Sequence, residues 1–279
     1  MANTYLRFPQ GKPKAITLSY DDGVEQDERL LQLMIQYGFK GTFNLSYGRT
    51  PAEGVTYPEG QVHRRMPLSW IKRVYNTPNA EIAIHGNTHA HMELMKGGEL
   101  LEEITEDRKG WEKELGGIVR GMAYPYGGYN DRVVEALRMA GIAYARTTVS
   151  TEKFSLPKDW LRLPATCHHH NPRLMELAEK FATHRVATHP QLFYLWGHSY
   201  EFEQRNDWDV IEAFFVRMQN LPDVWYATNI EIYDYIQAYE RLEYSCNGRR
   251  VYNPSVLPVW LERNGTLYCV NPAETVDLQ

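Results

Sequence analysis

Two adjacent carboxylates, Asp21 and Asp22, directly follow the apolar run "AITLSY" of residues 15–20. Neighbouring carboxylates repel each other, and aspartate at such a position is commonly a turn former or a helix cap. A divalent cation offers a second reason for the pair, because it neutralises one carboxylate while the other stays ionised and basic. The pair therefore predicts either a cap or part of a metal-dependent catalytic site.

The segment "EIAIHGNTHAH", residues 81–91, places three histidines after a second apolar run. His85 and His89 are four positions apart, so a helical turn or a tight turn brings their imidazoles together. With Asp22 they would form a triad of two histidines and one carboxylate that leaves positions open for water and substrate. Surface or structural histidines are the alternative, and we expect His91 to face away from such a site.

Two further apolar runs end in residues suited to catalysis. In "GMAYPYGGYN", residues 121–130, a proline and two glycines predict an irregular turn whose backbone N–H groups could stabilise an oxyanion, although a plain turn has the same pattern. The run "LFYLWGHSYE", residues 192–201, carries His198. Histidine titrates near neutrality and is a common proton donor to leaving groups, although a single histidine at a strand end is more often structural.

Apolar runs alternate with amphipathic stretches over most of the chain, which predicts parallel strands with helices outside them. The expected strands are residues 14–20, 40–47, 80–85, 118–124, 143–149, 192–198 and 224–228. The expected helices are residues 26–37, 99–115, 131–140, 207–219 and 229–241, with Gly38, Gly116 and Gly141 as end signals. Six or seven such units favour a closed or nearly closed α/β barrel, and an open doubly wound sheet is the alternative. Catalytic residues of parallel α/β proteins gather at the carboxyl ends of the strands, where the residues above would lie.

The last part of the chain has a different pattern. Residues 243–279 contain short alternating runs, and Asn264-Gly265 is a strong signal for a type I′ hairpin. We expect a barrel over residues 1–242 and a small β appendage over residues 243–279 packed against it. The appendage has no cluster of potential ligands, so we expect it to contribute no chemistry.

Composition limits the kinds of partner. The 279 residues are 43% hydrophobic and 23% charged, with a formal net charge of −5, as in an ordinary globular protein without a polybasic patch. Neither nucleic acid nor a membrane is therefore an expected partner. The three cysteines form no even disulfide framework, and the first residues show no apolar signal region, so we expect a cytoplasmic protein. Homo-oligomerisation stays open.

The motifs "SYDDG", "HGNTH", "YPYG" and "LWGH" occur in this order within residues 14–235. Together they resemble the polysaccharide deacetylase (NodB-homology) family, carbohydrate esterase family 4. The resemblance implies an irregular (β/α)7 barrel and one divalent cation, commonly zinc, with cobalt, nickel or manganese as alternatives. It implies the following roles: Asp21 as general base; Asp22, His85 and His89 as metal ligands; His198 as general acid; the backbone N–H of Tyr126 as part of the oxyanion hole; and Trp196 in the pocket for the acetyl methyl group.

Three more residues are expected near the substrate. Tyr124 and Pro125 belong to the third motif, and His169 lies in "CHHHN", residues 167–171, which follows a further expected strand end. For that histidine run we favour the edge of the substrate pocket over metal ligation, because Asp22, His85 and His89 already form a complete set.

The sequence departs from the family at two positions. The third motif has Ala123 where relatives commonly have arginine, and Gly86 follows the first histidine where serine or threonine is usual. Arg146 lies in the middle of the next expected strand. A surface arginine is the simple interpretation, but a mid-strand arginine in a parallel barrel has few solvated positions, and a buried one needs an anionic partner. We therefore expect Arg146 to point inward and pair with Asp21, which assigns it a catalytic function.

These observations predict a metal-dependent hydrolase that removes an acetyl group from an N- or O-acetylated saccharide, small or oligomeric. An amidohydrolase acting on a small cyclic amide or ureide is the first alternative, because "HGxxH" forms are familiar among relatives that act on other C–N bonds. An inactive module that binds metal and saccharide is the second, because of the missing arginine. Turnover of acetylated sugars, cyclic imides and ureides, with and without metal, separates the three.

Overall fold

A central parallel sheet organises the chain in the computed structural model, which describes residues 4–279. The strands pair in the order β7-β6-β5-β4-β3-β2-β9-β8, and β10 pairs with the first half of β2. These strands are β2 (Lys14–Asp21), β3 (Gly41–Leu45), β4 (Ala80–Ile84), β5 (Gly121–Ala123), β6 (Tyr144–Ser150), β7 (Leu163–Ala165), β8 (Cys167–His168), β9 (Gln191–Gly197) and β10 (Val224–Tyr226). Each strand expected from the sequence is present.

The sheet curves into an irregular α/β barrel, as predicted. Its hydrogen-bonded ladder is open rather than closed, with β7 at one end and β8 at the other. These two strands are consecutive parts of one segment and only Thr166 separates them. The N–H of Thr166 donates to the carbonyl of Tyr194 in β9 over 2.8 Å, so this single segment links the two ends of the sheet.

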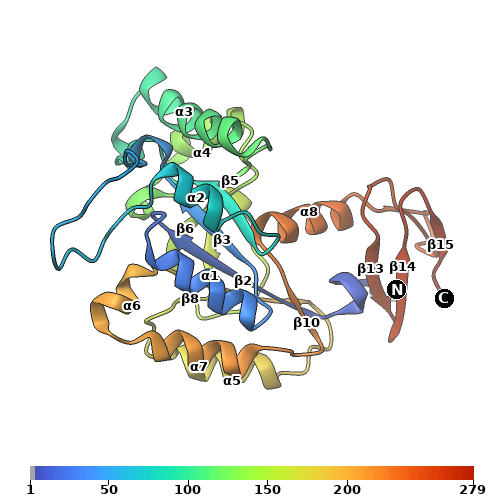
Figure 1. Cartoon of the computed structure of the whole chain (residues 1–279). Helices are drawn as coiled ribbons and strands as arrows, with labels where there is room; N and C mark the ends of the chain where they lie inside the picture. The colour runs from blue at the N-terminus through green and yellow to red at the C-terminus, as the bar shows by residue number, and fades with distance from the viewer. Residues whose placement is uncertain (1–3) are drawn as a thin grey trace.

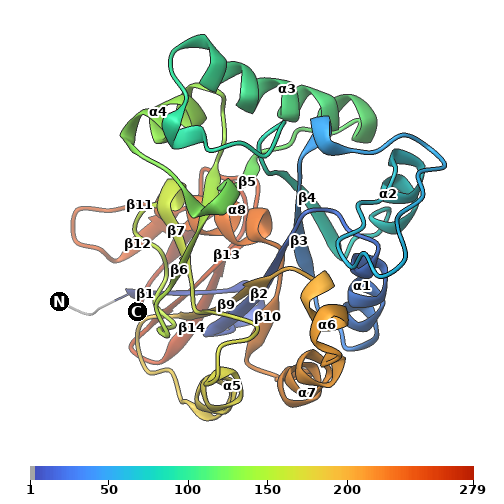
Figure 2. The ribbon, with the colours of Figure 1, turned by 90° about the vertical axis from the view of Figure 1, so that its left-hand side faces the viewer.

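Helices surround the strands (Figure 2). They are α1 (Gln26–Gln36), α2 (Leu68–Val74), α3 (Gly98–Leu115), α4 (Asp131–Met139), α5 (Leu174–Thr183), α6 (Tyr200–Arg205), α7 (Trp208–Met218) and α8 (Asn229–Glu240), with short 3-10 turns between them. The sequence predicted α1, α3, α4, α7 and α8 within two residues at each end. It did not predict α2, α5 or α6, and α2 and α6 are too short for a clear helical periodicity.

Strand β2 forms the centre of the barrel, and all eight of its residues are buried. It pairs with β3 on one side and β9 on the other, so its carboxyl end lies between two other strand ends. The carboxyl ends of β4, β5 and β6 continue along the same edge of the sheet. This arrangement brings side chains from distant parts of the sequence to one end of the barrel.

The C-terminal appendage lies beyond α8, on the right of Figure 1, on the side opposite the loop of residues 50–67. It contains two small antiparallel sheets, β1-β13-β14 and β11-β12-β15. Their strands are β1 (Thr4–Arg7), β11 (Glu243–Tyr244), β12 (Arg250–Tyr252), β13 (Val259–Arg263), β14 (Thr266–Val270) and β15 (Thr275–Asp277). Asn264 (φ 52°) and Gly265 (φ 79°) connect β13 to β14, which confirms the type I′ hairpin.

The N-terminal strand β1 was not predicted, and it pairs with β13 of the appendage rather than with the barrel. The division at residue 242 stays a prediction, although the appendage sheet clearly recruits a strand from the other end of the chain. Within residues 4–279, no helix is both long and apolar enough to cross a membrane.

Candidate active site and metal centre

Asp21, the last residue of β2, is buried at the centre of the site and only 3% exposed. Its Oδ1 accepts a hydrogen bond from Asn44 Nδ2 over 2.8 Å, and its Oδ2 forms an ion pair with Arg146. The Nε2 atoms of His85 and His198 each lie 3.8 Å from the same Oδ2. Burial alone would raise the pKa of Asp21, but Arg146, His85 and His198 together lower it below its ordinary value, so the carboxylate stays ionised.

Arg146 points inward from β6 and is 1% exposed, so the expected contact with Asp21 is present. Its guanidinium carbon lies 4.4 Å from the centre of the Trp196 ring, which adds a cation–π contact. Ala123 is the residue of β5 directly beside Arg146 in the sheet. The arginine missing at position 123 is therefore replaced by one on the neighbouring strand, and its charge reaches the same carboxylate.

Asp22, His85 and His89 form a group in which one ligand atom from each residue lies within 4.8 Å of the others. Asp22 directly follows β2, while His85 and His89 lie in the loop after β4. That loop is a turn rather than a helix, and the two imidazole rings are 4.7 Å apart. His91 lies outside the group, because its ring stacks on Tyr126 at 4.2 Å and its Nδ1 lies 3.0 Å from Glu93.

The two histidines of this group have the chemical form that a metal requires. Burial lowers the pKa of His85 and lowers that of His89 to about 4, so both rings are neutral near pH 7. His85 Nδ1 lies 2.8 Å from the carbonyl oxygen of Ala123, to which it donates, so Nε2 keeps its lone pair. The buried carboxyl of Asp107 accepts the backbone N–H of His85 over 3.0 Å, which holds the residue in place.

Asp22 has two cationic or polar partners that the sequence did not predict. Arg65 Nη2 donates to its Oδ1 over 2.6 Å, and His63 Nε2 lies 3.1 Å from its Oδ2. Burial would raise the pKa of Asp22, but His63 and Arg65 keep it well below its usual range. A carboxylate has about four lone-pair sites, so these contacts leave room for a cation. The donor set of the Asp22 group thus fits a divalent metal.

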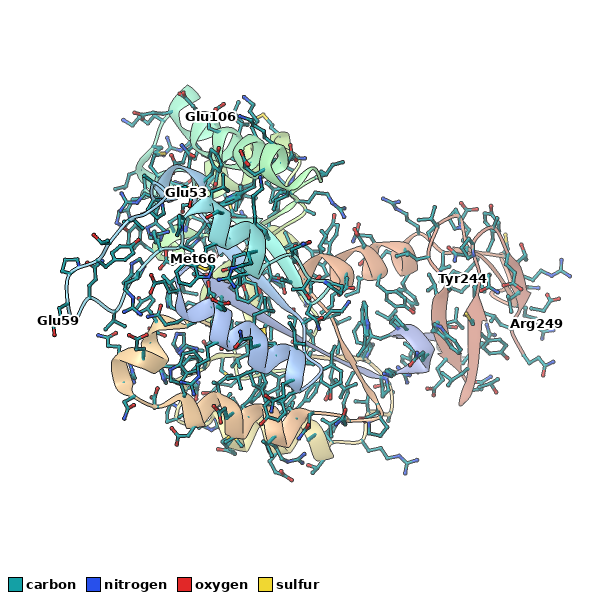
Figure 3. The ribbon with its side chains drawn as sticks, viewed as in Figure 1. Glu53, Glu59, Met66, Glu106, Tyr244 and Arg249 are labelled. Carbon is teal, nitrogen blue, oxygen red and sulfur yellow. The ribbon has the colours of Figure 1, made fainter. Side chains whose placement is uncertain are left out.

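The loop between β3 and α2 supplies both partners of Asp22. In Figure 3, Glu59 marks its outermost part and Met66 its return to the protein, where the Met66 side chain is fully buried. The N–H of Met66 donates to the carbonyl of Gly23 over 2.9 Å, which aligns this segment with the residues after β2. Because this loop lies on the side of the barrel away from the appendage, so does the candidate site (Figure 1).

Three site residues other than glycine have left-handed backbone conformations. These are Asp22 (φ 85°), His89 (φ 57°) and Tyr126 (φ 57°). Such conformations cost on the order of 1–3 kcal/mol for each residue and are concentrated at functional sites. Their coincidence at one end of the barrel supports a functional origin for the cluster.

His198 lies at the other side of Asp21. Its Nε2 faces Asp21, and its Nδ1 lies 3.6 Å from Glu201 Oε1 in α6. Burial would lower the pKa of His198, but the carboxylates of Glu201 and Asp21 raise it above its ordinary value. The protonated ring is therefore favoured close to an ionised base. Glu201 was not singled out from the sequence, because a glutamate in a short helix carries no signal of its own.

The residues expected to contact substrate occupy different environments. Tyr126 is exposed beside His89, with 4.6 Å between the two rings, and Trp196 lies at the site beneath the Arg146 guanidinium. Three others, Tyr124, Pro125 and His169, are buried. The Tyr124 hydroxyl donates to the carbonyl of Leu161 over 2.6 Å. These three side chains are therefore largely shielded from solvent, and their expected contact with substrate stays a prediction.

Comparison with known proteins relates nearly half of the chain to one protein family. Residues 9–145 match the model of the polysaccharide deacetylase family. This segment is therefore similar to polysaccharide deacetylase domains. The matched segment includes Asp21, the Asp22 group and Tyr126, whereas Trp196 and His198 lie beyond it. No curated protein matches the chain.

Solved structures share the fold. A Mycobacterium smegmatis protein assigned as a polysaccharide deacetylase has a TM-score of 0.58 and 15% identity, over 84% of this chain and 94% of that one. An active variant of a family 4 carbohydrate esterase pseudoenzyme from Bacillus anthracis has a TM-score of 0.51 and 16% identity, over 82% and 70% of the chains. An acetate complex of a Streptococcus pyogenes deacetylase has a TM-score of 0.44 and 19% identity, over 52% and 62%, so the chain covers less than two thirds of that protein.

Proposed function

We propose that this chain is a metal-dependent hydrolase that removes an acetyl group from an N- or O-acetylated saccharide. The observation that carries the proposal is the position of Asp21 Oδ2, which lies 3.8 Å from both His85 Nε2 and His198 Nε2. One carboxylate oxygen thus faces the ligand group and the candidate acid at once. The family of the domain favours acetyl groups on saccharides as the substrate class.

The residues that would hold the cation are Asp22, His85 and His89. A divalent metal bound there supplies a Lewis acid for the acetyl carbonyl and lowers the pKa of a water molecule toward about 7. Zinc suits this mixture of imidazole and carboxylate, as do cobalt, nickel and manganese.

The protein groups around that position divide the proton transfers. Asp21 is ionised and accepts the proton of the attacking water, while Arg146 maintains its charge and orientation. The backbone N–H of Tyr126 stabilises the negative charge that develops on the carbonyl oxygen. His198 then donates its proton to the leaving amine or alkoxide, which balances the proton taken by Asp21.

Two sequence features, Gly86 and the absence of arginine at position 123, suggested alternative functions, and the structure explains both features in other ways. Gly86 has φ 75°, and a Cβ there would lie 3.1 Å from Pro125 and 3.2 Å from Glu103. Glycine is thus required by backbone conformation and packing, without any reference to a cyclic amide substrate. The arginine missing from position 123, which motivated an inactive module, is replaced by Arg146. Deacetylation is therefore the function that we favour. A cytoplasmic location and a homo-oligomer stay predictions.

The test is a panel of N-acetylated sugars, O-acetylated sugars, cyclic imides and ureides, assayed after chelation and after addition of Zn²⁺. We expect turnover of acetylated sugars that depends on the metal. Asp21→Asn should lower the rate by roughly 10²–10⁴ while the metal stays bound, because a base is lost and no ligand is. Asp277→Asn in the appendage is the matched control and should retain full activity. Metal-dependent turnover of ureides alone would overturn the substrate class, and full turnover by Asp21→Asn would overturn the mechanism.

A further inference from the structure

Three consecutive histidines lie on the far side of His198 from Asp21. His168 ends β8, and His169 and His170 form the turn after it. All three rings converge on one oxygen of Glu201 in α6. The distances to Glu201 Oε2 are 3.2 Å from His168 Nε2, 2.9 Å from His169 Nε2 and 3.8 Å from His170 Nδ1.

Several atoms of this cluster are buried without a hydrogen-bond partner. Within the described residues 4–279, both ring nitrogens of His169 and of His170 lack one, as does Glu201 Oε2. His169 is completely buried, and its 2.9 Å approach to Glu201 does not have hydrogen-bond geometry. An unsatisfied buried polar group costs about 1–3 kcal/mol, so several at one point indicate a missing ligand.

The spacing of these atoms suits a cation. Zinc binds imidazole nitrogen at about 2.0–2.1 Å and carboxylate oxygen at about 2.0–2.2 Å, so neighbouring ligand atoms of a tetrahedral site are about 3.3 Å apart. The separations of His169 and His170 from Glu201 Oε2, 2.9 and 3.8 Å, lie on either side of that value. One ligand atom from each of the four residues lies within 4.8 Å of the others. Imidazole with carboxylate favours zinc and similar borderline cations over calcium or magnesium.

The surroundings hold the candidate ligands in place. His170 Nε2 lies 3.1 Å from Asp207 Oδ2; the contact lacks hydrogen-bond geometry, but the nearby carboxylate favours a proton on Nε2, which leaves Nδ1 free to bind a metal. The His169 ring packs between Tyr20 and Phe202, with ring centres 5.6 and 4.2 Å away. A Cβ at Gly197 would lie 2.1 Å from His169 Nδ1, so the neighbouring strand has room for this ring only because it has glycine there.

His168 has a different role from its two neighbours. Its Nδ1 accepts the backbone N–H of His170 over 3.1 Å, so in the neutral ring the proton is on Nε2. That nitrogen lies 3.2 Å from Glu201 Oε2 without hydrogen-bond geometry, and because it carries the proton it has no lone pair to offer a metal. His168 is therefore left out of the ligand set, and its proton faces the Glu201 carboxylate.

We propose that His169 Nε2, His170 Nδ1 and Glu201 Oε2 form a second divalent-cation site of the zinc class. The site is separate from the Asp22 group, with His198 between the two. The competing explanation is a metal-free cluster in which the histidines only hold Glu201 against His198. The two explanations differ in the number of cations that the folded chain binds.

The experiment counts cations on the full chain. Protein freed of metal by a chelator and dialysed is titrated with Zn²⁺ alone, and binding is followed by calorimetry and elemental analysis. We expect two equivalents for the wild type. His85→Gln with His89→Gln should bind one, His170→Gln should bind one, and the triple variant should bind none. The exposed His184 provides the matched control, and His184→Gln should bind two.

A further variant and a second cation distinguish loss of a metal ligand from misfolding of the His170→Gln variant. Asp207→Asn keeps all ligands but removes the carboxylate behind His170, so affinity at the second site alone should fall by about 10–100-fold. Co²⁺ bound to the His85→Gln, His89→Gln variant should give the visible absorption of a tetrahedral site. If the wild type bound only one equivalent of Zn²⁺ and His170→Gln bound the same amount, the proposal of a second site would be wrong. Because the variants address each site separately, an inactive wild type that binds two cations would refute the proposed function alone.

Discussion

Replacing Arg146 by methionine tests the central charge pair of the site. Its side chain is 1% exposed and that of Asp21 is 4% exposed, so this pair belongs with buried ion pairs rather than with exposed pairs, which contribute about 0.2–1 kcal/mol. Removing one partner of a buried pair costs about 3–5 kcal/mol, because the other charge stays buried without compensation. Asn44 still donates to Asp21 in the variant, and methionine still packs on Trp196. We therefore expect Arg146→Met to lower the free energy of unfolding by about 3 kcal/mol, the lower end of this range.

The assay is thermal and denaturant unfolding of four proteins: wild type, Arg146→Met, Asp21→Asn and the double variant. At about 2–4 °C per kcal/mol for chains of 150–250 residues, Arg146→Met should lower Tm by roughly 6–12 °C. The double variant buries no unpaired charge, so its loss of stability should be smaller than the sum of the two single losses. Arg146→Lys is the matched control for charge and should lose less stability than Arg146→Met.

The same variant has a kinetic signature. Without Arg146, the pKa of Asp21 rises, so the acid limb of the pH–rate profile should move to higher pH. Three results would each contradict a buried functional pair. They are a stability loss below 1 kcal/mol in Arg146→Met, a loss in the double variant equal to the sum of the two single losses, and a pH–rate profile whose acid limb does not move.

Three further predictions concern other parts of the chain. Burial raises the pKa of Asp27 to about 7, so ionising this carboxyl destabilises the folded protein by an amount that grows from pH 4 to pH 7 and reaches about 4 kcal/mol. In unfolding titrations, Asp27→Asn should therefore become more stable relative to wild type as the pH rises over this range. A stability difference that does not change with pH would exclude the effect. Gly265 has φ 79° and open space around it, so Gly265→Ala should lower the free energy of unfolding by about 1–2 kcal/mol in denaturant unfolding, because alanine disfavours this backbone conformation. Gly117 also faces open space, and Gly117→Ala should leave the stability nearly unchanged. Equal losses in the two variants would show that the left-handed conformation at residue 265 is not the cause. His91→Ala should retain all bound metal by elemental analysis, because the His91 ring stacks on Tyr126, and loss of one equivalent would make it a ligand.

The candidate active-site cluster could be anticipated from the sequence because its members occupy strand ends. Asp21, His85 and His198 each follow an apolar run, and parallel strands bring such positions to one edge whatever their separation along the chain. Arg146 could be placed by a similar argument, since a charged residue in the middle of a barrel strand needs a buried partner. Sequence patterns could therefore predict the positions of those site residues that strands hold in place.

The partners contributed by irregular segments could not be anticipated. His63 and Arg65 come from a loop without helical or strand periodicity, and only the pairing of that loop along residues 22–25 brings them to Asp22. Glu201 lies in a six-residue helix, and nothing in the sequence relates it to His169. His169 was expected at the edge of the pocket, but its ring turns inward because Gly197 leaves room for it.

The pairing of β1 with β13 affects the order in which the chain folds. Arg7 and Glu262, joined by an ion pair in this sheet, are 255 positions apart. During synthesis β1 emerges before the barrel strands, yet its partner β13 is made only after the last barrel helix, α8. The entropic cost of closing so long a loop falls once the barrel has folded and brought its two ends together. The appendage sheet is therefore expected to assemble last, and hydrogen exchange during refolding should protect β1 later than β2, although β1 precedes it by only a few residues.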